Sequence, residues 1–219
     1  MILIFDLDDT LYPERTYVES GFRAVAQWLS GQFGWPEGEL RELMLNLLET
    51  EGRGHIFERV LERNGVLLRG VAEKCLGVYR GHRPDIFLDE AASLFLRTYN
   101  GPLYVVTDGN KMVQQKKVDA LGLSKWFKKV LITHRYGVSH AKPSTYCFEK
   151  IKEMEKCSWA DLVYIGDNPA KDFVNLNPLG VLTIRVLTGE HRHVQAKAGF
   201  DASVTVSNFD DLDQMISTL

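Results

Sequence analysis

The stretch Ile4-Phe5-Asp6-Leu7-Asp8-Asp9-Thr10-Leu11 changes abruptly from apolar to acidic. Its first two residues end the apolar run Met1–Phe5, which predicts a strand buried on both faces, because short runs without alternation suit parallel sheets covered by helices on both sides. Three carboxylates then crowd the beginning of the next loop. Like charges so close together repel one another unless a cation offsets the repulsion. The stretch therefore predicts a central strand that ends in an acidic loop.

Five further runs are short, apolar and rich in β-branched residues. They are Leu103–Thr107, Lys129–Thr133, Leu162–Gly166, Val181–Val186 and Ala202–Val206. Helical segments lie between them or after them: Met112–Leu121, which stops at Gly122, then Tyr146–Lys156, and Phe209–Leu219 with Asn208 as its cap. This alternation predicts an α/β fold with a Rossmann-like parallel sheet flanked by helices.

Residues 14–84 interrupt that alternation. Four segments there carry apolar residues at helical spacing: Tyr17–Phe33, Glu37–Glu51, His55–Asn64 and Val71–Arg80. We therefore expect an all-helical cap domain at 14–84, inserted into a core formed by 1–13 and 85–219. Such a module is well placed to cover the edge of the sheet where ligands bind in open α/β folds.

Composition narrows the class of protein. The 219 residues include 26 Lys and Arg against 29 Asp and Glu, a net charge of −3, which argues against a dedicated nucleic-acid binder. No apolar run approaches the roughly 18 residues of a membrane span. The N-terminus does not resemble a secretory signal, because aspartates interrupt its first apolar stretch after five residues. The three cysteines, Cys75, Cys147 and Cys157, show no metal or disulfide spacing. We expect a cytoplasmic globular protein, either a monomer or a homodimer.

Polar groups also follow the other predicted strands. Thr107 and Asp108 end the second, Asp167 and Asp172 follow the fourth, and Lys142 lies between them in the sequence. If all the strands are parallel, these groups converge on one edge of the sheet. They would then offer carboxylate oxygens for a hard cation such as Mg²⁺, together with a hydroxyl, backbone N–H groups and one ammonium. That set suits a bound, reacting phosphoryl group.

These motifs resemble the haloacid dehalogenase superfamily, most of whose members are Mg²⁺-dependent phosphatases. The family pattern has four elements: DxDx[TV] after the first strand, a Thr or Ser after the second, a Lys, and a late acidic pair after Gly. All four occur here in that order, in Asp6–Thr10, Thr107, Lys142 and Gly166–Asp172. The resemblance spans nearly the whole chain. Asp8 favours the phosphatase branch, because the dehalogenase branch lacks this second aspartate.

The resemblance implies roles for the acidic residues. Asp6 would be the nucleophile that forms an aspartyl-phosphate, and Asp8 the general acid and then the general base. Mg²⁺ would be held by the Asp6 side chain, the Asp8 backbone carbonyl and Asp167. Asp172 would contribute either directly or through water.

The remaining elements of the pattern would bind the phosphoryl group. Thr107 would donate its hydroxyl, Asp108 its backbone N–H, and Lys142 would neutralise charge and orient Asp6. Asp108 stands where many relatives have Asn, which adds negative charge near the phosphate. Because only its backbone N–H is expected to contact phosphate, we do not expect this departure to abolish activity.

The resemblance predicts a phosphoric monoester hydrolase whose substrate is a small phosphorylated metabolite of the sugar-phosphate or nucleotide type. Two alternatives remain: a phosphomutase, which returns the phosphoryl group to a substrate hydroxyl, and a regulatory protein that binds phosphate without catalysis. A response-regulator receiver fits poorly, because its phosphorylated Asp follows the third strand and it has no cap.

Two histidines and four residues of the predicted cap are further candidates. His191 and His193 have a spacing that could bind a metal, although a solvated loop is the favoured interpretation. Polar or aromatic residues in or near loops of the predicted cap could face the site, although surface solubility is favoured for each: Arg15, Tyr17, Arg53 and His55.

Overall fold

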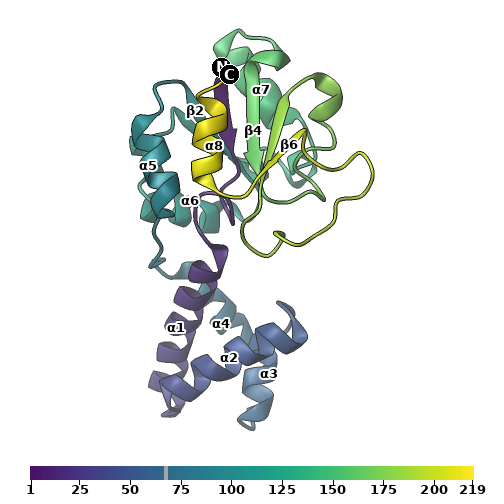
Figure 1. Cartoon of the computed structure of the whole chain (residues 1–219). Helices are drawn as coiled ribbons and strands as arrows, with labels where there is room; N and C mark the ends of the chain where they lie inside the picture. The colour runs from purple at the N-terminus through teal and green to yellow at the C-terminus, as the bar shows by residue number, and fades with distance from the viewer. Residues whose placement is uncertain (67–68) are drawn as a thin grey trace. The chain divides into compact units, whose positions relative to one another are not determined.

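The computed structural model describes residues 1–66 and 69–219, which form two compact units (Figure 1). One unit, the core unit, joins Met1–Glu14 to Ile86–Leu219, and the other, the helical unit, is Arg15–Asp85. None of the helices in the described ranges is both long enough and apolar enough to cross a membrane.

A six-stranded parallel sheet forms the centre of the core unit, as the sequence predicts. Its strands are β1 (Ile2–Phe5), β2 (Leu103–Thr107), β3 (Lys129–Ile132), β4 (Leu162–Gly166), β5 (Leu182–Val186) and β6 (Val204–Val206). They lie in the order β3-β2-β1-β4-β5-β6. The predicted strands are one or two residues longer at some ends, where Met1, Thr133, Val181 and residues 202–203 lie outside the ladders.

Strand β1 occupies the point where the strand order reverses. Leu3 pairs with Leu103 of β2 on one side and with Val163 of β4 on the other. Connections leave in opposite directions from such a switch point, which opens a crevice beyond the carboxyl ends of the two central strands. The acidic loop after Phe5 therefore begins where an open α/β sheet binds its ligands.

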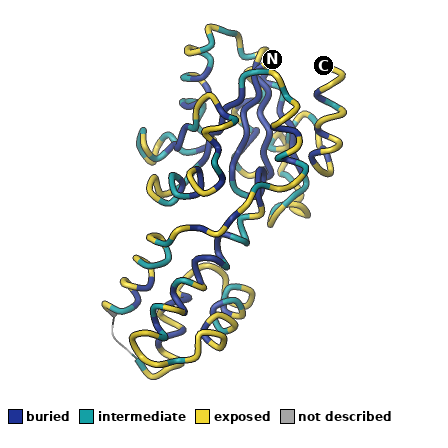
Figure 2. The backbone as a smooth tube through the Cα atoms, turned by 90° about the vertical axis from the view of Figure 1, so that its left-hand side faces the viewer, coloured by how far each residue is buried: buried dark blue, intermediate teal, exposed yellow. Residues whose placement is uncertain are grey.

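Helices cover both faces of the sheet, which explains why the strands read as continuous apolar runs. Ile2 and Ile4 lie in one cluster with Phe148 and Ile151 of α7 (Tyr146–Glu155). On the other face Phe5 contacts the rings of residues from α5 (Glu90–Thr98) and α8 (Phe209–Ile216). The central strands are accordingly buried along their length (Figure 2).

The predicted helix boundaries in the core unit depend on local capping. Asn208 caps α8 by accepting a hydrogen bond from the N–H of Asp211 at 2.9 Å, as predicted. Helix α6 (Lys111–Ala120) ends before Gly122, whose φ of +63° favours glycine.

Helix α5 is an element of the core unit that the sequence analysis does not predict. Five short 3₁₀ helices complete the unit: Leu123–Lys125, Thr133–Arg135, Val138–His140, Trp159–Asp161 and Asn177–Leu179.

The helical unit contains α1, which begins at the unit boundary, and three further helices. Their bounds are α1 (Glu14–Phe33), α2 (Glu37–Glu51), α3 (Ile56–Arg63) and α4 (Arg69–Gly81). The apolar faces of the four helices meet in one cluster that includes Phe22, Leu29, Met44 and Val60. A separate hydrophobic core shows that this insertion is a structural unit of its own. That it serves as a cap stays a prediction.

Candidate active site

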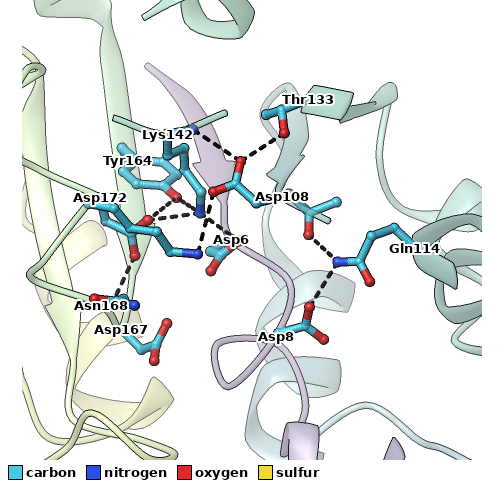
Figure 3. A network of polar contacts seen from close by, with 12 residues as sticks. Asp6, Asp8, Asp108, Gln114, Thr133, Lys142, Tyr164, Asp167, Asn168 and Asp172 are labelled. Carbon is cyan, nitrogen blue, oxygen red and sulfur yellow. Dashed lines mark hydrogen bonds and ion pairs between the residues drawn. The ribbon is translucent and has the colours of Figure 1, made fainter. Parts of the chain in front are cut away.

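Three neighbouring strands deliver polar side chains to one edge of the sheet (Figure 3). Asp6 directly follows β1, Thr107 is the last residue of β2, and Asp167 directly follows β4. All three are buried. Because the strands are parallel, their carboxyl ends meet at the same edge, and residues more than 100 positions apart become neighbours.

Lys142 lies between two of the predicted site carboxylates. Its Nζ is 2.8 Å from Asp6 Oδ1 and 2.8 Å from Asp172 Oδ1, and its side chain is 1% exposed. Burial lowers the pKa of the Lys142 ammonium, but the charges of Asp172 and Asp6 outweigh burial and hold it well above its usual value. Lys142 therefore carries a positive charge against the predicted nucleophile.

Tyr164 completes this buried group from inside β4. Its hydroxyl accepts a hydrogen bond from Lys142 Nζ at 2.9 Å and donates one to Asp172 Oδ1 at 3.1 Å. The other oxygen of Asp172 accepts the N–H of Asn168 at 3.0 Å. The position of the Lys142 ammonium is thus determined by three oxygen atoms from three different segments.

Asp6, Asp167 and Asp172 form a cluster of buried carboxylates. One oxygen from each lies within 4.8 Å of the others. Burial, with the charge of Asp172, raises the pKa of Asp6 to about 6, although Lys142 opposes the shift. Burial and the charges of Asp6 and Asp172 raise the pKa of Asp167 to about 9. When all three carboxylates are ionised, the cluster holds more negative charge than Lys142 alone compensates.

The donor set of this cluster fits Mg²⁺. Mg²⁺ prefers carboxylate oxygens and needs few of them, because it keeps several of its waters. Burial first, and then the charges of neighbouring carboxylates, raise the pKa values of Asp6 and Asp167, and a divalent ion would favour the ionised forms of both. The residues present thus suit the ion that the sequence predicts.

Asp8 points into a second polar group, formed with α6 and the turn after β1. Its Oδ1 accepts hydrogen bonds from Lys117 Nζ at 2.6 Å and from the Tyr12 hydroxyl at 2.5 Å, and its Oδ2 accepts from Gln114 Nε2 at 2.8 Å. Burial alone would raise the pKa of Asp8, but Lys117 and these hydrogen bonds hold it below its usual value. Asp8 is therefore ionised when no substrate is bound.

Gln114 links this second group to the end of β2. Its Nε2 also donates to Thr107 Oγ1 at 2.6 Å. Because one amide nitrogen donates to both Asp8 and Thr107, it holds the predicted proton donor close to the predicted phosphate-binding hydroxyl.

The Asp108 carboxylate is occupied by protein groups. Its Oδ1 accepts from the hydroxyl of Thr133 at 2.8 Å and from the N–H of Lys142 at 3.1 Å, and its Oδ2 lies 3.4 Å from Lys171 Nζ. Burial raises the pKa of Asp108, but Lys142 and Lys171 outweigh it and the net pKa lies below the usual value. Its negative charge therefore binds the segments that carry Thr133, Lys142 and Lys171 to the end of β2.

Several residues of the site were not predicted from the sequence. Tyr12, Gln114, Thr133, Tyr164 and Lys171 all contact a predicted site residue. One local signal existed: Tyr164 is a polar-tipped side chain in a predicted fully buried strand, and a buried tyrosine hydroxyl usually needs a partner. Tyr12 lies only four positions from Asp8, but Gln114 reaches Asp8 across 106 positions. Thr133 and Lys171 reach Asp108 across 25 and 63 positions.

The two histidines of the loop after β5 differ in their surroundings. Nδ1 of His191 is 2.9 Å from Asp167 Oδ2, and the His191 side chain is 33% exposed. His193 is exposed. The favoured interpretation of a solvated loop is therefore wrong for His191, which contacts the carboxylate cluster.

The four candidates in the helical unit have varied environments. Arg15 forms ion pairs at 3.0 Å with Glu19 and with Glu49. Tyr17 is buried, and its ring packs edge-on against another ring of the unit, so surface solubility is wrong for this residue. Arg53 and His55 are exposed and line a cavity of about 460 Å³ within the unit.

A comparison with protein families matches residues 1–173 to a model described as haloacid dehalogenase-like hydrolase. The match includes all the acidic motifs of the site.

Two curated relatives cover most of the chain. Both are named glyceraldehyde 3-phosphate phosphatase. The protein from Methanocaldococcus jannaschii is 24% identical, over 99% of this chain and 97% of its own length. The protein from Methanopyrus kandleri is 26% identical, over 89% of this chain and 87% of its own length.

Solved structures show the same fold. A haloacid dehalogenase superfamily hydrolase from Geobacter sulfurreducens superposes with a TM-score of 0.69 at 15% identity, covering 98% of this chain and 95% of its own. The putative hydrolase YfnB from Bacillus subtilis, solved with bound magnesium, gives a TM-score of 0.68 at 17% identity, over 98% and 97% of the two chains. With the family model spanning most of the sequence, the chain belongs to the haloacid dehalogenase-like hydrolases.

Proposed function

We propose that the protein is a Mg²⁺-dependent phosphatase that hydrolyses a small phosphomonoester through an aspartyl-phosphate on Asp6. One observation carries the proposal. A buried nucleophile candidate, Asp6, lies 2.8 Å from a buried ammonium, Lys142, and belongs to a cluster of three carboxylates suited to a hard cation. A dianionic phosphate could approach Asp6 only if such positive charge offset the repulsion between them.

In the first step an oxygen of Asp6 attacks phosphorus and the bond to the leaving oxygen breaks. Asp8 gives its proton to that oxygen, so that a neutral alcohol departs. Because Asp8 is ionised in the free protein, it first takes up a proton from solvent as the approach of a negatively charged phosphate raises its pKa, and this is the proton that it gives to the leaving oxygen.

In the second step Asp8 takes a proton from a water molecule, which attacks phosphorus and releases inorganic phosphate and the Asp6 carboxylate. Thr107 and the N–H of Asp108 donate hydrogen bonds to the phosphoryl oxygens, and Lys142 neutralises part of their charge. Preorganised donors of this kind contribute about 3 kcal/mol each to stabilisation of a transition state.

Mg²⁺, held by Asp6, Asp167, Asp172 and the backbone carbonyl of Asp8, would supply positive charge to the phosphoryl group. The predicted role of the helical unit as a cap belongs to the same proposal, because a closing cap excludes water from the first step and selects the substrate.

A sugar phosphate is the substrate class that we propose. The names of both curated relatives give a three-carbon sugar phosphate as their substrate. Glyceraldehyde 3-phosphate is therefore the first compound to test, beside hexose phosphates and nucleoside monophosphates.

The experiment measures phosphate release from this panel, with Mg²⁺ and with a chelator. We expect release that depends on Mg²⁺ and falls at least about 1,000-fold in Asp6→Asn, because the variant lacks the attacking carboxylate. Asp213→Asn makes the same chemical change at an exposed position and should retain full activity.

Three results would contradict the proposal. Release that persists in Asp6→Asn would exclude an aspartyl-phosphate on this residue. Transfer of the phosphoryl group between sugar positions, with little free phosphate, would identify a phosphomutase, whereas no turnover of any compound would favour a phosphate-binding regulatory role.

A further inference from the structure

The loop after β5 places a histidine against the carboxylate cluster. His191 Nδ1 lies 2.9 Å from Oδ2 of Asp167, a residue that is almost completely buried. An ionised carboxylate offers only acceptors, so the hydrogen of this bond belongs to the imidazole when Asp167 is charged. One oxygen of Asp167 is then engaged, and the other is left for the ion.

Arg185 holds this loop from inside the sheet. It belongs to β5, is 4% exposed, and its Nη2 donates to the carbonyl oxygens of His191 at 2.8 Å and Val194 at 2.7 Å. A buried guanidinium loses most of its hydration, so each carbonyl that it binds is hard to release. The backbone of His191 is therefore anchored at its own carbonyl.

Asp9 holds the same loop from the other side. Its Oδ2 accepts the N–H of Glu190 at 3.2 Å, and its carbonyl oxygen accepts a hydrogen bond from the hydroxyl of Thr188. Asp9 belongs to the acidic stretch that also contains Asp6 and Asp8. The segment that supplies the proposed nucleophile thus also orients the loop that carries His191.

We propose that His191 is a positioning residue for Asp167, which it holds in the orientation that binds the divalent cation. The inference rests on the proposed function, because it concerns the ion of that site. Hydrogen bonds to metal-binding side chains restrict their rotation, and the loss of such a partner commonly weakens metal binding about 10-fold to 100-fold. Arg185 and Asp9 supply the rigidity that such a role requires, which an unanchored surface histidine would lack.

The test measures the affinity of the purified protein for Mn²⁺, a spectroscopic probe for a site of this kind, by electron paramagnetic resonance without substrate. We expect His191→Ala to weaken Mn²⁺ binding about 10-fold. In His191→Asn the amide nitrogen takes the place of Nδ1 and should restore affinity close to that of the wild type. His193→Ala, in the same loop and exposed, is the matched control and should bind as the wild type does.

The outcomes separate this inference from the function on which it rests. Asp167→Asn should weaken Mn²⁺ binding strongly, and if it does not, or if the wild type binds no Mn²⁺, the proposed metal site is itself wrong. If Asp167→Asn weakens binding but His191→Ala does not, only the role of His191 is overturned. Tighter binding in His191→Ala would also overturn it, since the imidazole would then compete with the ion. Circular dichroism of each variant confirms that it is folded.

Discussion

Lys117 and Lys142 are both buried ammonium groups that neutralise an aspartate, yet they influence different steps of the proposed reaction. Lys142 lies between Asp6 and Asp172, at 2.8 Å from each. Lys117 Nζ is 2.6 Å from Asp8 and 3.3 Å from Glu14. The first ammonium therefore favours attack by the nucleophile, whereas the second holds the proposed general acid in its ionised form until a substrate arrives.

Replacing Lys117 by Met tests this assignment. The pKa of Asp8 should rise, because burial then acts without the opposing ammonium. Breaking a largely buried ion pair should lower the free energy of unfolding by about 3 kcal/mol at pH 7. Urea unfolding measures this change.

The effect of Lys117→Met should depend on pH with a definite sign. The pKa of Asp8 in the folded protein is below the value of about 3.9 for an unfolded aspartate. The ion pair therefore stabilises the wild type fully above about pH 4, and this contribution is lost as pH falls through the folded pKa. The variant and the wild type should differ most at neutral pH and converge in acid. Lys111→Met, on the exposed first turn of the same helix, should leave the free energy of unfolding unchanged at neutral and at acidic pH. A loss in this variant equal to that in Lys117→Met would contradict the assignment.

At the scale of elements, the site depends on loops that follow buried strands. The loop after β5 meets the acidic loop after β1 at Gly189, whose φ is +60°. A Cβ at this glycine would lie 2.1 Å from Cγ of Asp9, far closer than atoms can approach. Only glycine meets both conditions, so the contact between the two loops depends on a residue without a side chain.

We therefore expect Gly189→Ala to destabilise the protein by at least about 3 kcal/mol, from backbone strain and overpacking together. Gly180→Ala is the matched control. Gly180 has a φ of +83°, but nothing lies within 4 Å of the position of its Cβ. Strain alone should cost about 1 kcal/mol there. Urea unfolding measures the free energy of unfolding of both variants. Equal losses of this free energy would show that the contact with Asp9 is unimportant.

At the scale of the whole molecule, the carboxylate cluster links stability to pH and to metal. Burial with neighbouring charge raises the pKa of Asp6 to about 6 and that of Asp167 to about 9. Both values exceed that of about 3.9 in an unfolded chain. The folded, metal-free protein therefore holds more protons than the unfolded one at intermediate pH, and the free energy of unfolding falls as pH rises through this window.

Without metal, we expect these two groups to lower stability between about pH 4 and pH 9, by at most about 1.4 kcal/mol per pH unit for each extra proton that the folded state holds. Mg²⁺ should stabilise the protein more at pH 8 than at pH 6, because binding requires ionised carboxylates and releases their protons. Thermal unfolding with Mg²⁺ and with a chelator measures both effects. Asp167→Asn should flatten the pH dependence, while Asp213→Asn should not; a metal-free protein equally stable across this window would refute the linkage.

Much of the fold could be predicted because its signals are local. The strands are buried on both faces, so their sequences are continuously apolar, and the acidic residues stand directly after them. Asn208 likewise caps α8 through atoms only three residues apart. Helix α5 was missed although its cap is also local: Asp89 accepts hydrogen bonds from the N–H groups of Ala91 and Ala92. Its short length gives a weak periodic signal.

The parallel α/β class, the helical insertion and the identity of the acidic residues follow from the order of the amino acids, because hydrophobic periodicity and strand ends are properties of neighbouring residues. Most of the groups that contact those acids become known only from the folded chain. Lys117 reaches Asp8 across 109 positions, Tyr164 reaches Lys142 across 22, and His191 reaches Asp167 across 24. Such pairs arise from the order of strands in the sheet and from the loops that it brings together, and no local pattern encodes them.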